Sequence, residues 1–202
     1  DFVMKYRKLS FLDAVGQLTS APSTGLATEP KATLQKFIPR AKLLERVTAF
    51  YQKAFRDDGR GLHYLQSRGI KNPSIFEAHR IGFCNGTLFK AIPENGEIIE
   101  QLKAIGILQD NNRESFEDCI IFPIMNASGV VLTLYGRKIT DSGTVKHLYL
   151  SGSRYGLVNG LALKSYPEII LTESIIDALS LMQSGIKNVI PCYGTNGFTD
   201  FH

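Results

Sequence analysis

A strand–helix–strand pattern near the end of the sequence constrains the fold more than any other feature. The segment EIILT (residues 168–172) is short and apolar, a helical pattern follows over about 174–183, and NVIPC (residues 188–192) is a second apolar run. Gly185 lies where the C-terminal cap of that helix is expected. Strands joined by a single crossover helix pair in parallel, so we predict a βαβ unit with two neighbouring parallel strands.

Before this unit, helical patterns give way to strand patterns. Apolar residues recur at helical spacing over residues 40–56, and shorter helical patterns cover residues 61–67, 73–79 and 97–104. From Cys119 onward, the apolar runs CIIFPI and VVLTLYG flank the turn sequence NASG, which predicts an interior β-hairpin, and a further strand is expected near residues 146–150. The expected fold class is α+β, with a mixed α/β subdomain followed by a partial, Rossmann-like βαβ unit.

The first 33 residues have a different character. Leucine and valine recur at helical spacing between Lys8 and Leu18, which predicts a short amphipathic helix. Residues 19–33 are rich in Ser, Thr, Pro, Gly and Ala without apolar periodicity, as in a flexible linker. We therefore divide the chain into a terminal segment 1–18, a linker 19–33, a subdomain 34–160 and the βαβ segment 161–202.

Positive charge is concentrated in one part of the chain. The net charge is +4, but residues 31–68 hold nine Lys and Arg against three acids, which makes that segment +6 and the remainder −2. A basic stripe on a helix suits a polyanion such as nucleic acid, and Lys42, Arg46 and Lys53 are the candidate contacts. An ordinary solvated helix face is the open alternative.

Composition also disfavours several classes of protein. No run reaches the roughly 18 apolar residues of a membrane helix, and Asp1 to Lys8 lacks a signal pattern, so we expect a soluble, cytoplasmic protein without a membrane partner. Cys84, Cys119 and Cys192 form no CxxC pair and have no histidine at ligand spacing, so neither a disulfide framework nor a zinc site is expected. We expect all three cysteines to be buried.

Two acidic residues follow the first strand of the βαβ pattern. Glu173 comes directly after that strand, at the sheet edge where α/β proteins place their sites, and Asp177 lies one helical turn further on. Paired carboxylates of this kind hold Mg²⁺. In the alternative interpretation, Glu173 complements the positive end of a helix dipole and Asp177 is a solvated helix residue.

Five segments resemble, in a consistent chain order, parts of bacterial DnaG-type primases: four their catalytic core and one the domain that precedes it. TESIIDALSL followed by NVIPCYGTNG resembles the first half of a Toprim domain, with Glu173-Ser174 where that module usually has Glu-Gly. DCIIFPIMNASGVVLTLYGRKI resembles a core segment with a Gly-Arg pair, and VKHLYLSGSRYGLVNG resembles the family's lysine-containing segment, especially in the form found in phages and mobile elements. GLHYLQSRGI is similar to an early core segment in which Tyr64 is expected to pack, and DFVMKYRKLSFLDAVGQL resembles the closing helix of a CHC2-type zinc-binding domain.

This resemblance implies an activity and the residues that carry it. The activity would be Mg²⁺- or Mn²⁺-dependent synthesis of RNA primers from ribonucleoside triphosphates on a single-stranded DNA template, with a replicative helicase as a further partner. Glu173, Arg137 and Lys146 would be catalytic, and Glu173 and Asp177 would bind the metal. The nucleic-acid-binding residues would be Lys42, Arg46, Lys53, Arg137, Lys146 and Arg154. The family's zinc ligands would precede Asp1 and its second acidic motif, Asp-x-Asp, would follow residue 202, so the chain alone is expected to be inactive.

Two rival functions remain open. A non-catalytic module could bind single-stranded nucleic acid through residues 31–68, and its binding would survive loss of both carboxylates. A Toprim nuclease would use the same carboxylates to cut DNA, but it would not explain the segments at 61–70 and 118–160.

Overall fold

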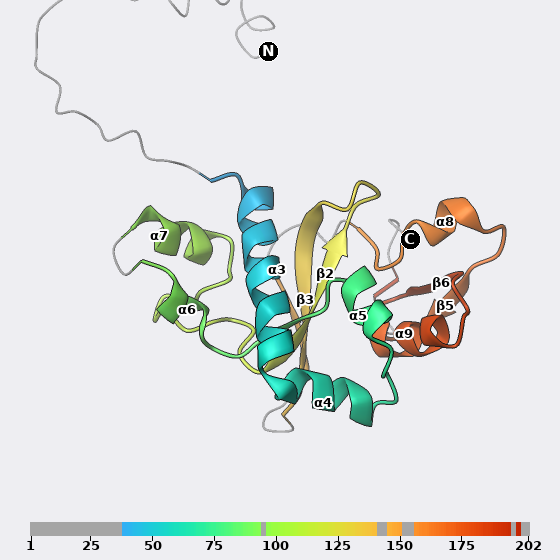
Figure 1. Ribbon diagram of the computed structural model, residues 1–202. Helices are drawn as coiled ribbons and strands as arrows, with labels where there is room; N and C mark the ends of the chain where they lie inside the picture. Colours follow the sequence, from blue (N-terminus) through green and yellow to red (C-terminus); the bar gives the residue numbers. More distant parts are fainter. Residues whose placement is uncertain (1–37, 94–95, 141–144, 151–155, 195–196, 199–202) are drawn as a thin grey trace, which may run out of the picture. The chain divides into compact units, whose positions relative to one another are not determined.

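The computed structural model describes residues 38–93, 96–140, 145–150, 156–194 and 197–198 (Figure 1). The predicted helix within residues 1–18, the linker 19–33 and Arg154 lie outside the described residues. The span Lys36–His202 forms one compact unit. Its helices are α3 (Arg40–Asp57), α4 (Gly59–Ser67), α5 (Pro73–Ala78), α6 (Leu88–Ala91), α7 (Glu97–Ala104), α8 (Ala162–Ser165) and α9 (Ile175–Gln183). Its strands are β1 (Gly82–Cys84), β2 (Cys119–Met125), β3 (Val131–Lys138), β4 (His147–Tyr149), β5 (Ile170–Thr172) and β6 (Val189–Pro191).

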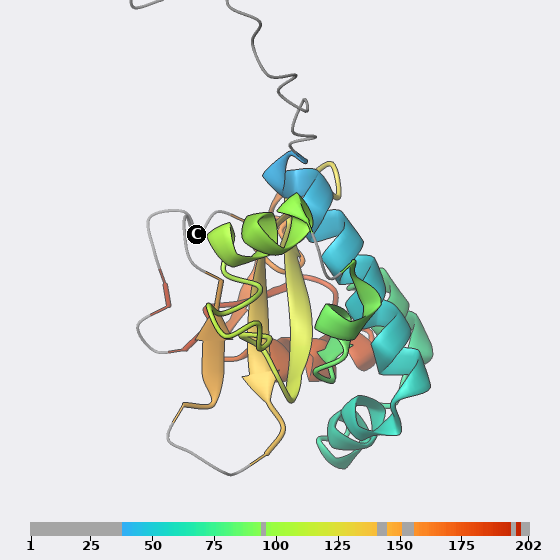
Figure 2. The same ribbon diagram turned by 90° about the vertical axis from the view of Figure 1, so that its left-hand side faces the viewer.

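The predicted hairpin forms the centre of an antiparallel sheet with the order β1-β2-β3-β4. Figure 2 shows β2, β3 and β4 side by side. At the hairpin turn, the Asn126 side chain accepts hydrogen bonds from the amides of Ser128 and Val130. Gly129 has φ +78°, a conformation that a side chain would strain, so the turn sequence suits this loop.

Helices cover both faces of this sheet. Because side chains alternate along a strand, Cys119 and Ile121 of β2 join one core, to which α3 and α7 contribute, whereas Ile120 and Phe122 join a second core with α5 and α9. In Figure 1, α3, α6 and α7 accordingly lie on one side of β2 and β3, and α5 and α9 lie on the other. The sheet therefore separates two apolar cores and contributes side chains to both.

The predicted βαβ unit is confirmed. Strands β5 and β6 pair in parallel, with Ile170 opposite Val189, and α9 connects them. Gly185 ends α9 with φ +92°. Buried side chains of α9, among them Leu179 and Met182, belong to the same core as Ile120 and Phe122. This packing attaches the βαβ unit to one face of the four-stranded sheet.

The helices also follow the sequence patterns closely. Helix α4 begins two residues earlier than expected because the Asp58 side chain caps it, accepting from the Arg60 amide. Asn72 caps α5 in the same way, with Pro73 at the first helical position. The short elements β1, α6 and α8 were not expected from the sequence.

One expectation about the cysteines is wrong. Cys84 and Cys119 are buried, but Cys192 is only half-buried, because it follows β6 at the sheet edge. No helix in the described part of the chain is both long and apolar enough to cross a membrane.

Candidate phosphate and metal site

The two predicted metal-binding residues lie where β5 passes into α9. Glu173 directly follows β5, and its backbone carbonyl accepts a hydrogen bond from Gly194 in the loop after β6 (2.7 Å). Asp177 lies in the first turn of α9, and both residues are exposed. The position at the carboxyl ends of two parallel strands is the one expected for a site in an open α/β sheet.

Ser174 stands where the Toprim modules that this segment resembles usually have glycine. It caps α9 with φ −118°, an extended conformation that any residue adopts. Its hydroxyl donates to Asp177 Oδ2 (2.7 Å) and accepts from the Asp177 amide (3.2 Å). The Ser174 hydroxyl thus caps the helix by accepting from the Asp177 amide, and the Asp177 carboxylate accepts from that same hydroxyl, so Asp177 already takes part in the start of α9.

The metal assignment therefore rests on two carboxylates. In the part of the chain that the structure describes, no group of three or more His, Cys, Asp or Glu side chains is arranged to hold a metal ion. Mg²⁺ is often held by one or two carboxylates together with water and substrate phosphates, and this donor set suits that use. The helix-dipole alternative is equally compatible with the positions of Glu173 and Asp177.

Arg137 lies near the end of β3, opposite His147 of β4 in the antiparallel register. Its Nε donates to the Tyr64 hydroxyl of α4 (3.2 Å), and its Nη1 lies 2.6 Å from His147 Nε2. Tyr64 was expected only to pack, but it also holds this arginine.

His147 reveals that several predicted site residues are neighbours in space. Its pKa is lowered because the protein removes water from the ring and because Arg137 and Lys146 add positive charge nearby, whereas the negative charge of Glu173 acts in the opposite direction. Arg137 thus contacts the imidazole directly, Lys146 precedes it in the chain, and Glu173 is near enough to act on it electrostatically. No signal in the sequence points to His147, because nothing in its local pattern distinguishes it from any strand residue.

An aromatic cluster around Tyr135 connects this region to the βαβ unit. The ring of Tyr135 lies 6.0 Å from that of His147, 5.1 Å from Tyr149 and 6.3 Å from Tyr193. Tyr193 follows β6, its carbonyl accepts from the Tyr149 hydroxyl (3.0 Å), and its own hydroxyl accepts from the Val158 amide (2.8 Å). These contacts fix the loop after β6 against β3 and β4.

The basic residues predicted on α3 lie elsewhere. Lys42, Arg46 and Lys53 are exposed and spaced to share one face of α3, which covers the opposite face of the sheet from Arg137. Lys53 forms an ion pair with Asp57, so its charge is partly neutralised. The structure therefore separates the predicted nucleic-acid-binding residues into two groups.

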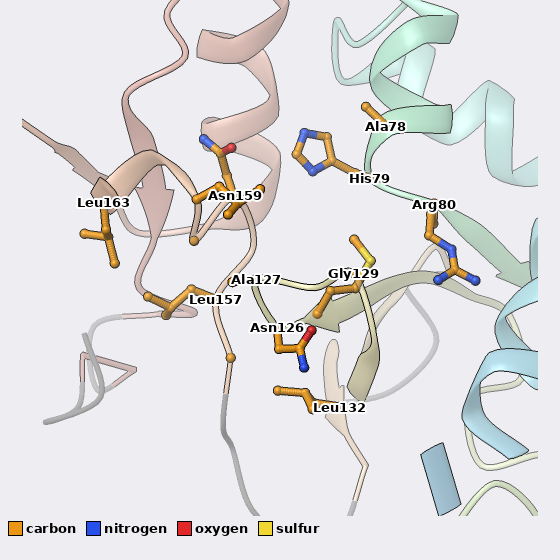
Figure 3. Close-up of a pocket in the computed structure, with 14 residues that line it drawn as sticks. Ala78, His79, Arg80, Asn126, Ala127, Gly129, Leu132, Leu157, Asn159 and Leu163 are labelled. Carbon is orange, nitrogen blue, oxygen red and sulfur yellow. The ribbon is translucent and has the colours of Figure 1, made fainter. Parts of the chain in front are cut away.

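A cavity of about 580 Å³ lies apart from both groups (Figure 3). It is lined by the end of α5, the β2–β3 turn and residues 156–163, and Figure 3 shows His79, Asn126 and Asn159 around it. None of the predicted site residues that the structure describes lines this cavity.

These features define a mixed α/β domain in which a βαβ unit packs on a four-stranded antiparallel sheet. Residues 50–154, just over half of the chain, match the family model described as the DNA primase catalytic core, N-terminal domain. The chain belongs to this family of DnaG-type primases.

The individual similarities agree with this assignment. The DNA primase of Haemophilus influenzae is 27% identical over 221 residues, which cover 96% of this chain and 37% of that protein. A DnaG primase catalytic domain bound to ssDNA has a TM-score of 0.66 at 22% identity, covering 80% of this chain and 57% of that one. The zinc-binding and RNA polymerase domains of Aquifex aeolicus primase give a TM-score of 0.65 at 23% identity, covering 94% and 50%. The chain spans little more than a third of the curated relatives it matches.

Proposed function

We propose that this chain provides part of the active region of a DNA primase, which makes short RNA primers on single-stranded DNA by metal-dependent nucleotidyl transfer. Family membership supports this activity, and the observation that carries it to particular residues is the contact of Arg137 with His147, which directly follows Lys146 in the chain and is within electrostatic reach of Glu173. A guanidinium grips phosphate oxygens with two parallel hydrogen bonds, and a lysine acts as a point charge. Arg137 and Lys146 therefore bind the phosphates of the nucleotide or of the nucleic acid.

Glu173 and Asp177 are the proposed ligands of Mg²⁺ or Mn²⁺. When bound, the metal would neutralise charge on the triphosphate. Ser174 orients Asp177 by donating to Oδ2, which leaves Oδ1 and the Glu173 carboxylate free of any partner among the described residues. The donor set is all oxygen, as hard cations prefer.

The division of the chain is part of the same proposal. Residues 34–160 would form the N-terminal subdomain of the core, and residues 161–202 the first part of a Toprim domain, which the observed β5–α9–β6 unit supports. Residues 1–18 would belong to a zinc-binding domain, in line with the similarity to a primase structure that contains one. The proposed partners are a single-stranded DNA template, which the ssDNA-bound relative supports, ribonucleoside triphosphates and a replicative helicase.

The test uses a full-length protein that carries this chain. We expect Glu173→Gln to lower primer synthesis by about 100-fold or more, because one metal-facing charge is lost while the shape is kept. Melting temperature should stay close to that of the unmodified protein. Glu168→Gln is the matched control, because Glu168 is an exposed acid just before β5. Asp177→Asn is harder to interpret, because it changes both the proposed metal ligand and the cap of α9.

If Glu173 only complements the helix dipole, the outcome reverses. The amide would then cost about 0.3–1 kcal/mol of stability and leave priming nearly intact. Normal priming by Glu173→Gln would remove Glu173 from the site.

A second candidate function rests on α3. Lys42 and Arg46 are exposed one turn apart and have no ion-pair partner among the described residues, as expected for a non-catalytic surface that follows a single strand. Replacing both with glutamine should flatten the salt dependence of single-stranded DNA binding, whose slope is about −0.7 per phosphate neutralised. Lys164→Gln is the control, because Lys164 is an exposed lysine on α8, outside this face. An unchanged slope would show that this face is merely solvated.

A further inference from the structure

The partners of Arg137 set it apart from four other arginines. Arg56, Arg60, Arg80 and Arg113 each form an ion pair with a carboxylate, among the described residues. The side chain of Arg137 instead meets the Tyr64 hydroxyl and the His147 ring. A carboxylate would orient the guanidinium and also cancel its charge. Neutral partners orient it and leave the charge available.

The chemistry of these contacts fixes the protonation pattern of His147. A guanidinium has five N–H donors and no acceptor, so His147 Nε2 accepts from Arg137 Nη1 and carries no proton. In a neutral imidazole the proton is then on Nδ1, which lies 2.6 Å from the Tyr135 hydroxyl oxygen and donates to it. Arg137 thereby selects the tautomer, and Tyr135 accommodates it because its hydroxyl can accept.

The strand register makes this arrangement rigid. Arg137 lies directly opposite His147, and Tyr135 lies opposite Tyr149 on the same face of β3 and β4. Tyr135 is buried, and desolvation raises its pKa well above the ordinary value, so its hydroxyl stays protonated. The backbone therefore positions both ends of the chain of hydrogen bonds.

We propose that His147 is a positioning residue, which holds Arg137 through a neutral acceptor so that the guanidinium stays charged and aimed at a phosphate group. Tyr64 occupies Nε and His147 occupies one hydrogen of Nη1, which leaves three N–H groups on Nη1 and Nη2 for the ligand. Those groups form the fork that binds two phosphate oxygens. The phosphate ligand rests on the function proposed above, but the orientation of Arg137 by His147 does not.

The first measurement concerns the tautomer alone. The ¹⁵N chemical shifts of the His147 ring in this chain, at pH 7.5 and without ligand, should show Nδ1 protonated and Nε2 bare. A ring protonated on Nε2, or on both nitrogens, would overturn the proposal whatever the protein binds.

The second measurement is calorimetric titration with inorganic tripolyphosphate. We expect His147→Leu to weaken binding about fivefold, and Arg137→Leu with His147→Leu to bind no more weakly than Arg137→Leu alone, because His147 acts through Arg137. His147→Gln should recover most of the affinity, since its amide oxygen replaces the acceptor at Nε2. His63→Leu, on exposed α4, is the matched control and should bind normally.

The outcomes separate this proposal from the proposed function. If Arg137→Leu weakens binding but His147→Leu does not, the positioning role is wrong and the phosphate site stands. If Arg137→Leu binds tripolyphosphate normally, the phosphate site is wrong, and the ring shifts alone decide whether His147 orients the arginine.

Discussion

Two polar clusters lie on opposite faces of the same sheet. In each, one ionisable side chain is bound by uncharged groups, but one cluster is enclosed in the core and the other contains Arg137 of the candidate site. The core cluster consists of Glu114, Tyr51, Cys84 and the amide of Leu88. Glu114 is 4% exposed and accepts from the Tyr51 hydroxyl (2.9 Å), the Cys84 thiol (3.0 Å) and the Leu88 amide (2.8 Å). The site cluster consists of Arg137, Tyr64, His147 and Tyr135, and Arg137 is only half-buried.

The comparison shows what burial does to an ionisable group with neutral partners. In the core cluster every partner is enclosed, so removing the carboxyl group leaves donors without water, and the cost appears as lost stability. In the site cluster the guanidinium still meets solvent, so its charge is available to a ligand and its removal costs the fold little. Substitutions in the core cluster should therefore lower stability, whereas substitutions in the site cluster should lower ligand binding.

The largest effect should come from Glu114→Ala. Three buried donors would lose their acceptor, so we expect the free energy of unfolding to fall by about 3 kcal/mol or more. Arg137→Leu should change it by less than about 1 kcal/mol. Urea titration of both variants is the measurement. Equal losses would mean that exposure does not distinguish the clusters.

A smaller loss of stability is expected from Gly136→Ala. Gly136 precedes Arg137 in β3 but faces the core that contains Phe116. A Cβ there would lie 2.5 Å from Phe116 Cδ1, so the buried ring would have to move, at a cost of about 1–3 kcal/mol. Gly59→Ala is the control, because nothing lies within 4 Å of a Cβ at that position. If both variants unfold at the same urea concentration, the packing of Phe116 against Gly136 is looser than the structure indicates.

The sequence predicts the helices and strands that carry both clusters far better than it predicts the side-chain contacts between them. Periodicity and capping signals placed α3, α7, α9 and the β2–β3 hairpin, because these depend on residues close in sequence. The contact between Tyr51 and Glu114 joins residues 63 apart, and that between Arg137 and Tyr64 joins residues 73 apart. Such pairings arise only when the sheet is assembled.

The candidate site was therefore foreseen in part. The position of Glu173 after a strand and the resemblance of the segments around Arg137 and Lys146 predict these residues, whereas the contact of Arg137 with His147 comes from the structure. The role of Glu173 and Asp177 as metal ligands stays a prediction.

Two matched hydroxyl deletions sharpen the contrast. Tyr51→Phe removes a buried donor to Glu114, so stability should fall by about 1 kcal/mol while tripolyphosphate binding is unchanged. Tyr64→Phe removes the acceptor of Arg137 Nε, so binding should weaken about two- to fivefold while stability changes by less than about 0.5 kcal/mol. A binding loss from Tyr51→Phe, or none from Tyr64→Phe, would contradict the division between the clusters.

The smallest effect is expected from pH, which should act through two histidines, His147 of the site cluster and His79, between pH 7.5 and 5.5. Burial lowers the pKa of His79, and desolvation together with Arg137 and Lys146 lowers that of His147. For a histidine whose folded pKa is lowered, the unfolded chain takes up the proton first. Stability is therefore complete above the unfolded pKa of about 6.5 and declines as the pH falls below it.

Tyr51 and Cys84 of the core cluster should not titrate over the same range. Burial raises the pKa of Tyr51 and Cys84 well above their ordinary values, so both keep their protons in the folded and the unfolded chain until the pH exceeds about 8.5. Glu45 and Asp58, whose pKa values are lowered by Arg80 and Arg60, stay ionised in both states above about pH 5. Urea midpoints should thus fall on acidification in the unmodified chain, fall less in His147→Gln and in His79→Gln, and fall least in the double variant. If the urea midpoint of His147→Gln falls on acidification as much as that of the unmodified chain, the fold does not oppose protonation of His147.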